Sequence, residues 1–150
     1  MSKVLLSLNF MYCMERFATQ IYRIQKGAFN DGQIEQKLKD ASENESGHVQ
    51  KLQRQIKQLN GKVYPFGFLF QSMGAILGFI TRMCGKGNLL KADTFVETRA
   101  VRDYSSFLKS VRFDSDTVVL IKKIISDEEV HIINWKKAKE SLAVKRPDSS

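Results

Sequence analysis

The sequence has few residues that interrupt regular structure. Its 150 residues contain only two prolines and nine glycines, fewer than a many-turned β-sandwich requires. We therefore expect long, uninterrupted elements, which favours helices. The two cysteines, Cys13 and Cys84, are too few for a disulfide framework and are typical of a reducing compartment. Residues 4–14 are apolar but lack the charged region and small-residue cleavage site of a signal peptide, so none is expected.

The overall composition indicates one folded domain. Hydrophobic residues make up 43% of the chain and charged residues 27%, which is ordinary for a globular protein and excludes a disordered or polytopic membrane chain. A formal net charge of +8 favours an anionic partner. Dense basic runs interleaved with aromatic residues are absent, as are zinc-finger and RNP signatures. We therefore expect an anionic membrane surface as the partner, and no nucleic acid.

The spacing of apolar residues predicts an all-α chain. Apolar side chains recur three and four positions apart, which places them on one helical face. The pattern predicts four long helices and one short apolar helix, at 3–26, 33–59, 65–81, 89–110 and 115–142. Residues 1–142 should form the domain, and the polar residues 143–150 a frayed tail.

The short helix predicted at 65–81 contains no charged side chain. Its seventeen residues lie at the lower limit for crossing a bilayer, so a buried or interfacial helix is expected rather than a membrane span. The flanking Lys62, Arg82, Lys86 and Lys91 would suit an anionic bilayer, although an ordinary core helix stays open as the alternative. The side chains expected to contact substrate or membrane are Phe70, Met73, Leu77 and Phe79.

The only two histidines share a sequence context. Glu45 precedes His48 by three residues, and Glu128 precedes His131 by three. Residues three apart project from the same helical face, and both pairs lie on the predicted core face. Glu129 lies about 100° around the helix from Glu128, so only one of the two can be a ligand, and the position of His131 selects Glu128.

Two more glutamates extend the pattern into an internal repeat. Glu15 precedes Glu45 by thirty residues, and Glu97 precedes Glu128 by thirty-one. Tyr22 and Tyr104 each follow their lone glutamate by seven, either as core aromatics or as hydrogen-bond partners of the ligands. One Glu from each of two helices plus a Glu-x-x-His from each of the other two is the ligand set of ferritin-like di-iron or di-manganese bundles. The predicted metal ligands and catalytic residues are Glu15, Glu45, His48, Glu97, Glu128 and His131.

Residues 15–131 resemble the 5-demethoxyubiquinone hydroxylases of ubiquinone biosynthesis, a branch of the ferritin-like superfamily. The resemblance rests on the glutamate and tyrosine pairs, the two Glu-x-x-His motifs, and a glycine-spaced apolar insert ending in Gly85-Lys86. It implies a ferritin-like four-helix bundle with a short apolar helical insert between the second and third bundle helices.

The same resemblance implies a function. Two iron ions, or manganese, would activate O₂ to hydroxylate a polyprenyl demethoxyquinone, with two electrons from NADH or a quinol. It also implies a peripheral enzyme on the cytoplasmic side of the inner membrane, or on the matrix side in a mitochondrion. A homo-oligomer or a partner biosynthetic protein is expected.

Two other functions fit the residues. A rubrerythrin-like peroxidase or a ferritin-like ferroxidase would use the same ligands, because a fold and its metal set do not define the reaction. A metal-free helical adaptor with a basic surface is the third reading.

Overall fold

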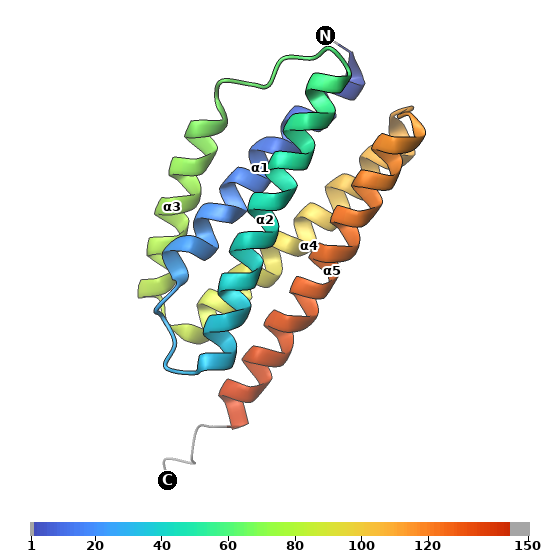
Figure 1. The fold of residues 1–150 in the computed structure, drawn as a ribbon. Helices are drawn as coiled ribbons and strands as arrows, with labels where there is room; N and C mark the ends of the chain where they lie inside the picture. The colour runs from blue at the N-terminus through green and yellow to red at the C-terminus, as the bar shows by residue number, and fades with distance from the viewer. Residues whose placement is uncertain (1, 145–150) are drawn as a thin grey trace.

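The computed structural model describes residues 2–144, which form five α-helices and no strand (Figure 1). This confirms the predicted all-α class, four long helices with one short apolar helix between the second and third. Of the predicted tail, residues 145–150 lie outside the described part, whereas Ala143 and Val144 belong to the last helix. The helices are α1 (Lys3–Gln25), α2 (Gly32–Gln58), α3 (Gly67–Met83), α4 (Lys86–Ser110) and α5 (Ser115–Val144).

Polar caps and turn residues set the helix boundaries. Asp31 caps α2 by accepting hydrogen bonds from the amides of Gln33 and Ile34, and Asp114 accepts from the amide of Thr117 at the start of α5. The start of α4 was predicted three residues too late. Gly85, at φ +88°, turns the chain directly into the helix, and its carbonyl accepts the amide of Leu89.

The four long helices form two hairpins, α1 with α2 and α4 with α5. Close backbone approaches are frequent within each hairpin and sparse between them, so large side chains fill the space between the hairpins. Two apolar clusters occupy this space at different heights. One contains Leu38, Leu90 and Trp135, and the other contains Leu52, Ala100 and Ile121. On each of the four long helices, the predicted ligands lie between residues of one cluster and residues of the other.

The short helix α3 packs on the outside of α1 through its glycines. A Cβ atom at Gly74 would lie 2.2 Å from the Phe17 carbonyl oxygen, and one at Gly78 would lie 2.9 Å from the Ile21 carbonyl oxygen. The two backbones therefore meet at a distance that only glycine permits. Arg82, at the end of α3, donates to the carbonyls of Ile24 and Lys26 at the end of α1.

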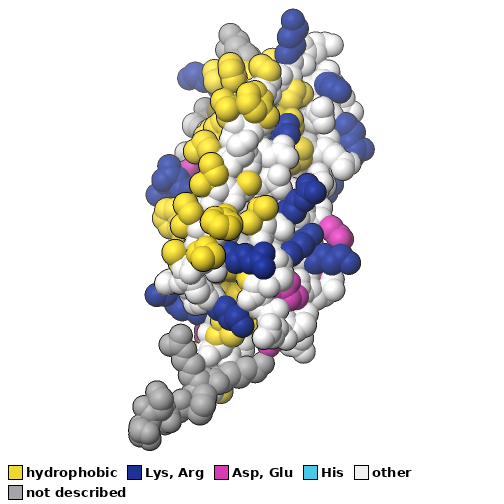
Figure 2. Space-filling model, turned by 90° about the vertical axis from the view of Figure 1, so that its left-hand side faces the viewer, with side chains coloured by type: hydrophobic (Ala, Val, Ile, Leu, Met, Phe, Trp, Pro, Cys, Tyr) yellow, Lys and Arg dark blue, Asp and Glu magenta, His cyan; other side chains and the backbone are white. Residues whose placement is uncertain are grey.

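The opposite face of α3 is apolar and exposed. Figure 2 shows hydrophobic side chains along this side of the molecule with Lys and Arg on both sides. Among residues 2–144, no helix is both long and apolar enough to cross a membrane. The apolar outer face of α3 consists of Phe68, Leu69, Met73, Ile76, Phe79, Ile80 and Met83.

Candidate metal centre

The six predicted ligands converge between the hairpins. Glu15 comes from α1 and Glu97 from α4, while α2 and α5 each supply a Glu-x-x-His pair, Glu45 with His48 and Glu128 with His131. All six are buried. The spacing of three keeps each glutamate and its histidine on the inner face of one helix.

The ligands form two overlapping groups. Glu15 and His48 belong to one group, and Glu97 and His131 to the other. Glu45 and Glu128 belong to both, and within each group the candidate ligand atoms lie within 4.8 Å of one another. Two carboxylates shared between two such groups are suited to bridge a pair of metal ions.

Both histidines point their Nδ1 atoms at the carboxylates. His48 Nδ1 lies 3.2 Å from an oxygen of Glu15 and 3.2 Å from one of Glu128. His131 Nδ1 lies 3.0 Å from Glu128 and 3.1 Å from Glu45. Although burial opposes it, these carboxylates raise the pKa of both imidazoles, that of His131 to about 12. Both histidines are therefore cationic when no metal is bound.

The carboxyl groups differ in their proton affinity. Burial and the nearby Glu128 carboxylate raise the pKa of Glu97 to about 8, and burial also raises the pKa of Glu45. Although burial opposes it, hydrogen bonds with His131 and His48 lower the pKa of Glu128 to about 2. A metal must displace the histidine protons, so its binding weakens as the pH falls.

The two tyrosines link the hairpins in a crossed arrangement. The Tyr22 hydroxyl of α1 donates to Glu97 of α4, and the Tyr104 hydroxyl of α4 donates to Glu15 of α1. Both tyrosines are completely buried, and burial raises their pKa further above the usual phenol value. Each tyrosine thus donates to one of the two glutamates that are not shared between the groups.

Asp127 contacts the cluster from outside, and the ligand pattern did not single it out. Its carboxylate lies 3.1 Å from His48 Nε2, on the side of the ring away from the cluster, and it also pairs with Lys123. A carboxylate in this position fixes the orientation of a metal-binding imidazole. Its position directly before Glu128 is the signal that could have identified it.

The donor set fits two divalent metal ions. Both side-chain oxygens of Glu45 and one of Glu128 are buried, and the nearest nitrogen to each is an imidazole Nδ1 atom at 3.1–3.5 Å that makes no well-formed hydrogen bond with it. Four buried carboxyl groups beside only two imidazoles are costly unless further cations neutralise them. The four carboxylates also balance the charge of two divalent cations, and carboxylate oxygen with imidazole nitrogen suits iron or manganese.

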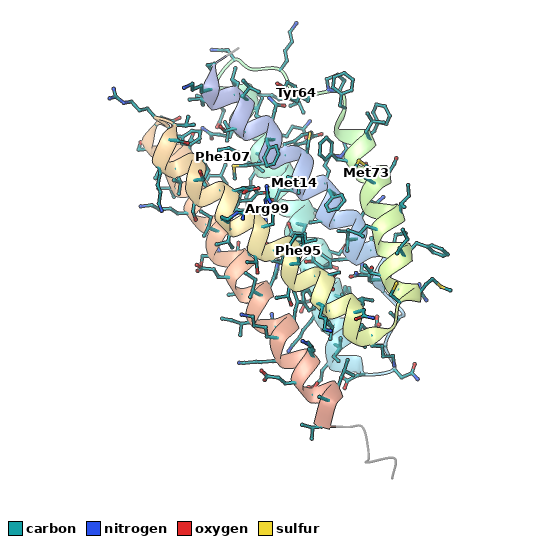
Figure 3. All side chains as sticks on the ribbon, turned by 180° about the vertical axis from the view of Figure 1, so that it is seen from behind. Met14, Tyr64, Met73, Phe95, Arg99 and Phe107 are labelled. Atoms are coloured by element: carbon teal, nitrogen blue, oxygen red, sulfur yellow. The ribbon has the colours of Figure 1, made fainter. Side chains whose placement is uncertain are left out.

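The four α3 residues predicted to contact substrate or membrane fall into two pairs. Met73 and Phe79 lie on the exposed outer face, whereas Phe70 and Leu77 are half-buried against the core clusters. Phe70 and Leu77 share a helical stripe with the buried Gly74 and Gly78, so the glycine spacing is the sequence signal that marks this face. Figure 3 shows Met73 on α3, Met14 on α1, and Phe95 and Phe107 on α4, viewed from behind.

The bundle and its carboxylate cluster define a protein of the ferritin-like di-metal carboxylate class. The comparison with protein families is more specific. The family described as Ubiquinone biosynthesis protein COQ7 matches residues 13–146, and the chain belongs to this family. The match covers all six ligands and α3. A search of curated proteins gave no significant match.

The family places the protein among the hydroxylating enzymes of ubiquinone biosynthesis, and such a function is associated with membranes.

Proposed function

We propose that the protein is a di-iron monooxygenase that hydroxylates the ring of a demethoxyquinone in ubiquinone biosynthesis. The observation that carries this proposal is the buried set of four glutamates and two histidines, with Glu45 and Glu128 shared between its two halves, in a member of this family. The second substrate is O₂, and NADH or a quinol supplies two electrons.

The residues divide into holding and orienting roles. Glu15 and His48 would hold one metal ion, Glu97 and His131 the other, and Glu45 and Glu128 would contact both. A reduced iron pair supplies the electrons that activate O₂ for insertion into the ring. Tyr22 and Tyr104 keep Glu97 and Glu15 oriented, and Asp127 keeps His48 oriented. Manganese is the alternative metal for the same ligands.

The outer face of α3 is proposed as the membrane contact. Exposed apolar surface of this extent is characteristic of a membrane or protein interaction site, and the flanking lysines and arginines match an anionic bilayer. Docking by this face would give the enzyme access to a polyprenyl quinone without crossing the bilayer. We propose a peripheral location, on the cytoplasmic side of the inner membrane or, in a mitochondrion, on the matrix side. A second copy or a partner biosynthetic protein would meet the remaining surface.

A peroxidase or ferroxidase could be built on the same ligands, so the cluster alone does not select the reaction. The exposed apolar face favours the hydroxylase, because a soluble peroxide or iron substrate needs no contact with lipid.

The test follows the quinone ring. The protein is loaded anaerobically with Fe(II), mixed with NADH, a short-chain demethoxyquinone and ¹⁸O₂, and the quinone is analysed by mass spectrometry. We expect one labelled oxygen in the product, and none with Glu97→Ala, which should still fold. Iron oxidation with an unchanged quinone, after a separate check that the quinone binds, would favour the ferroxidase or peroxidase.

A further inference from the structure

A cavity lined by six polar residues and by Ala41 and Val130 opens between α2 and α5, the two helices that supply the histidines. Its volume is about 290 Å³. In Figure 1 these helices lie towards the viewer, in front of α1 and α4, whereas the close contacts of α3 are with α1 and α4. The cavity therefore lies on a different side of the bundle from the proposed membrane contact.

The cavity reaches the metal centre at His131. This residue is the most exposed of the six ligands, at 7%, and it lines the cavity. Its Nδ1 atom faces the carboxylates, whereas its Nε2 atom has no hydrogen-bond partner among residues 2–144. Two further cavities, near Gly32 and near Lys91, are lined by no cluster residue.

The two histidines are held differently. Asp127 fixes the Nε2 atom of His48 from outside the cluster. No carboxylate does this for His131, whose neighbour across the cavity is Asn44. The Asn44 Oδ1 atom is buried and has no hydrogen bond. His131 therefore lacks the outer carboxylate that holds His48, although its ring lies against those of Tyr22 and Trp135, and it lies where the cavity meets the cluster.

The rest of the lining is rich in oxygen donors. Asp40 and Asn44 lie one turn apart on α2, and Asp127 and Asn134 lie two turns apart on α5. Carboxylate and amide oxygens suit hard divalent cations. Two positively charged lysine side chains are also near the cavity. Lys37 lines the cavity, and Lys123 is paired with Asp127.

We infer that the cavity between α2 and α5 is the route by which the divalent metal ions reach the cluster, with His131 as the last side chain they pass. This inference rests on the metal centre of the proposed function. It assigns separate sides of the bundle to the two partners, the side of the cavity to the metal ion and the outer face of α3 to the quinone.

The test measures the rate of metal uptake by the metal-free protein. Co²⁺ is mixed with the protein in a stopped-flow instrument, and the absorbance of the bound ion is followed. Asn134→Phe fills the cavity, and Ile133→Phe places the same ring on the neighbouring residue, which does not line it. We expect Asn134→Phe to slow uptake at least tenfold while the final Co²⁺ content stays unchanged, and Ile133→Phe to match the wild type.

A second pair of variants tests the charge without adding bulk. Asp40→Asn removes a carboxylate of the cavity, and Glu43→Gln removes an exposed carboxylate of α2 outside it. We expect Asp40→Asn to slow uptake by about threefold at low ionic strength and by less at high salt. Glu43→Gln should leave the uptake rate unchanged. This pair is decisive if Asn134→Phe does not fold.

The outcomes separate the two proposals. Equal uptake rates in the matched pairs, with Co²⁺ bound by the wild type, would overturn the route and leave the metal centre intact. A wild-type protein that binds no Co²⁺ would overturn the metal centre itself.

Discussion

The centre of the bundle and the outer face of α3 depart from the usual distribution of residues in opposite ways. The centre buries four glutamates and two histidines, and the outer face of α3 exposes phenylalanine, isoleucine and methionine side chains. Each arrangement is costly in isolation, because buried charge loses its hydration and exposed apolar surface orders water. A missing partner explains each cost, a cation in the centre and an apolar phase outside. The two regions that depart from the usual distribution of residues are therefore the two regions proposed to bind.

The largest expected effect concerns the centre and separates its shared carboxylates from its unshared ones. Because Glu45 and Glu128 belong to both groups, Glu45→Ala or Glu128→Ala should weaken binding of both metal ions, by a factor on the order of 100 or more. Glu15→Ala should weaken mainly the binding of one of the two metal ions. Metal content after anaerobic loading and desalting measures this, and equal losses in all three variants would remove the distinction between the groups.

The next effect concerns the outer face of α3. Ile76 and Phe79 are 60% and 61% exposed, so changing both to Asp should leave the Tm unchanged. Because each buried apolar side chain contributes about 1.5–3 kcal/mol, binding to vesicles that contain anionic lipid should fall at least tenfold. Val119→Asp is the control, since Val119 is equally exposed on α5, at 67%. A sedimentation assay in which all variants bind alike would rule out this face as the membrane contact.

The contact between α3 and α1 should be sensitive to a single methyl group. Gly74→Ala places a Cβ atom against the Phe17 carbonyl and should lower the free energy of unfolding by roughly 1–3 kcal/mol. Gly47→Ala, in α2, meets no atom within 4 Å and should raise it by about 0.5–1 kcal/mol. Urea denaturation measures both changes, and a harmless Gly74→Ala would show that α3 shifts easily on α1.

The last effect appears only as a dependence of stability on pH and involves a buried acid outside the cluster. Asp93 accepts a hydrogen bond from Gln25, and burial raises its pKa to about 8. Between pH 4 and pH 8 the folded state therefore holds a proton that the unfolded state has released, so this group lowers stability as the pH rises, by about 1 kcal/mol per unit.

Asp93→Asn removes this dependence and keeps the shape of the side chain. Its amide can also donate to the Gln25 oxygen, which has no hydrogen bond in the wild type. The variant should gain Tm relative to the wild type as the pH is raised from 5 to 8. A constant difference across this range would mean that Asp93 is already ionised in the folded protein.

Much of the fold and of the cluster could be predicted from the sequence. Helix periodicity predicted the five helices to within three residues at each end, because apolar spacings of three and four persist along each helix. The repeat of Glu15 and Glu45 in Glu97 and Glu128 predicted four glutamates on core faces, because spacings of three, four and seven all fall on one helical face.

The rest depends on contacts that a single helix does not encode. The burial of Asp93 follows from its place four residues before Glu97 on the same helical face, but its partners Gln25 and, through Gln25, Thr81 depend on where α1, α3 and α4 lie against one another. The cavity likewise requires the side chains of α2 and α5 to be placed together, as with Asn44 and Asn134.

The crossed tyrosine bonds relate the two hairpins as equivalent halves. Exchanging one hairpin for the other maps Tyr22 onto Tyr104 and Glu97 onto Glu15, so the same bond is made twice about an approximate twofold axis. Neither hairpin can complete this arrangement alone, because the acceptor of its tyrosine belongs to the other. The molecule therefore has the internal symmetry of a homodimer joined into one chain, with α3 lying within the connection between its halves.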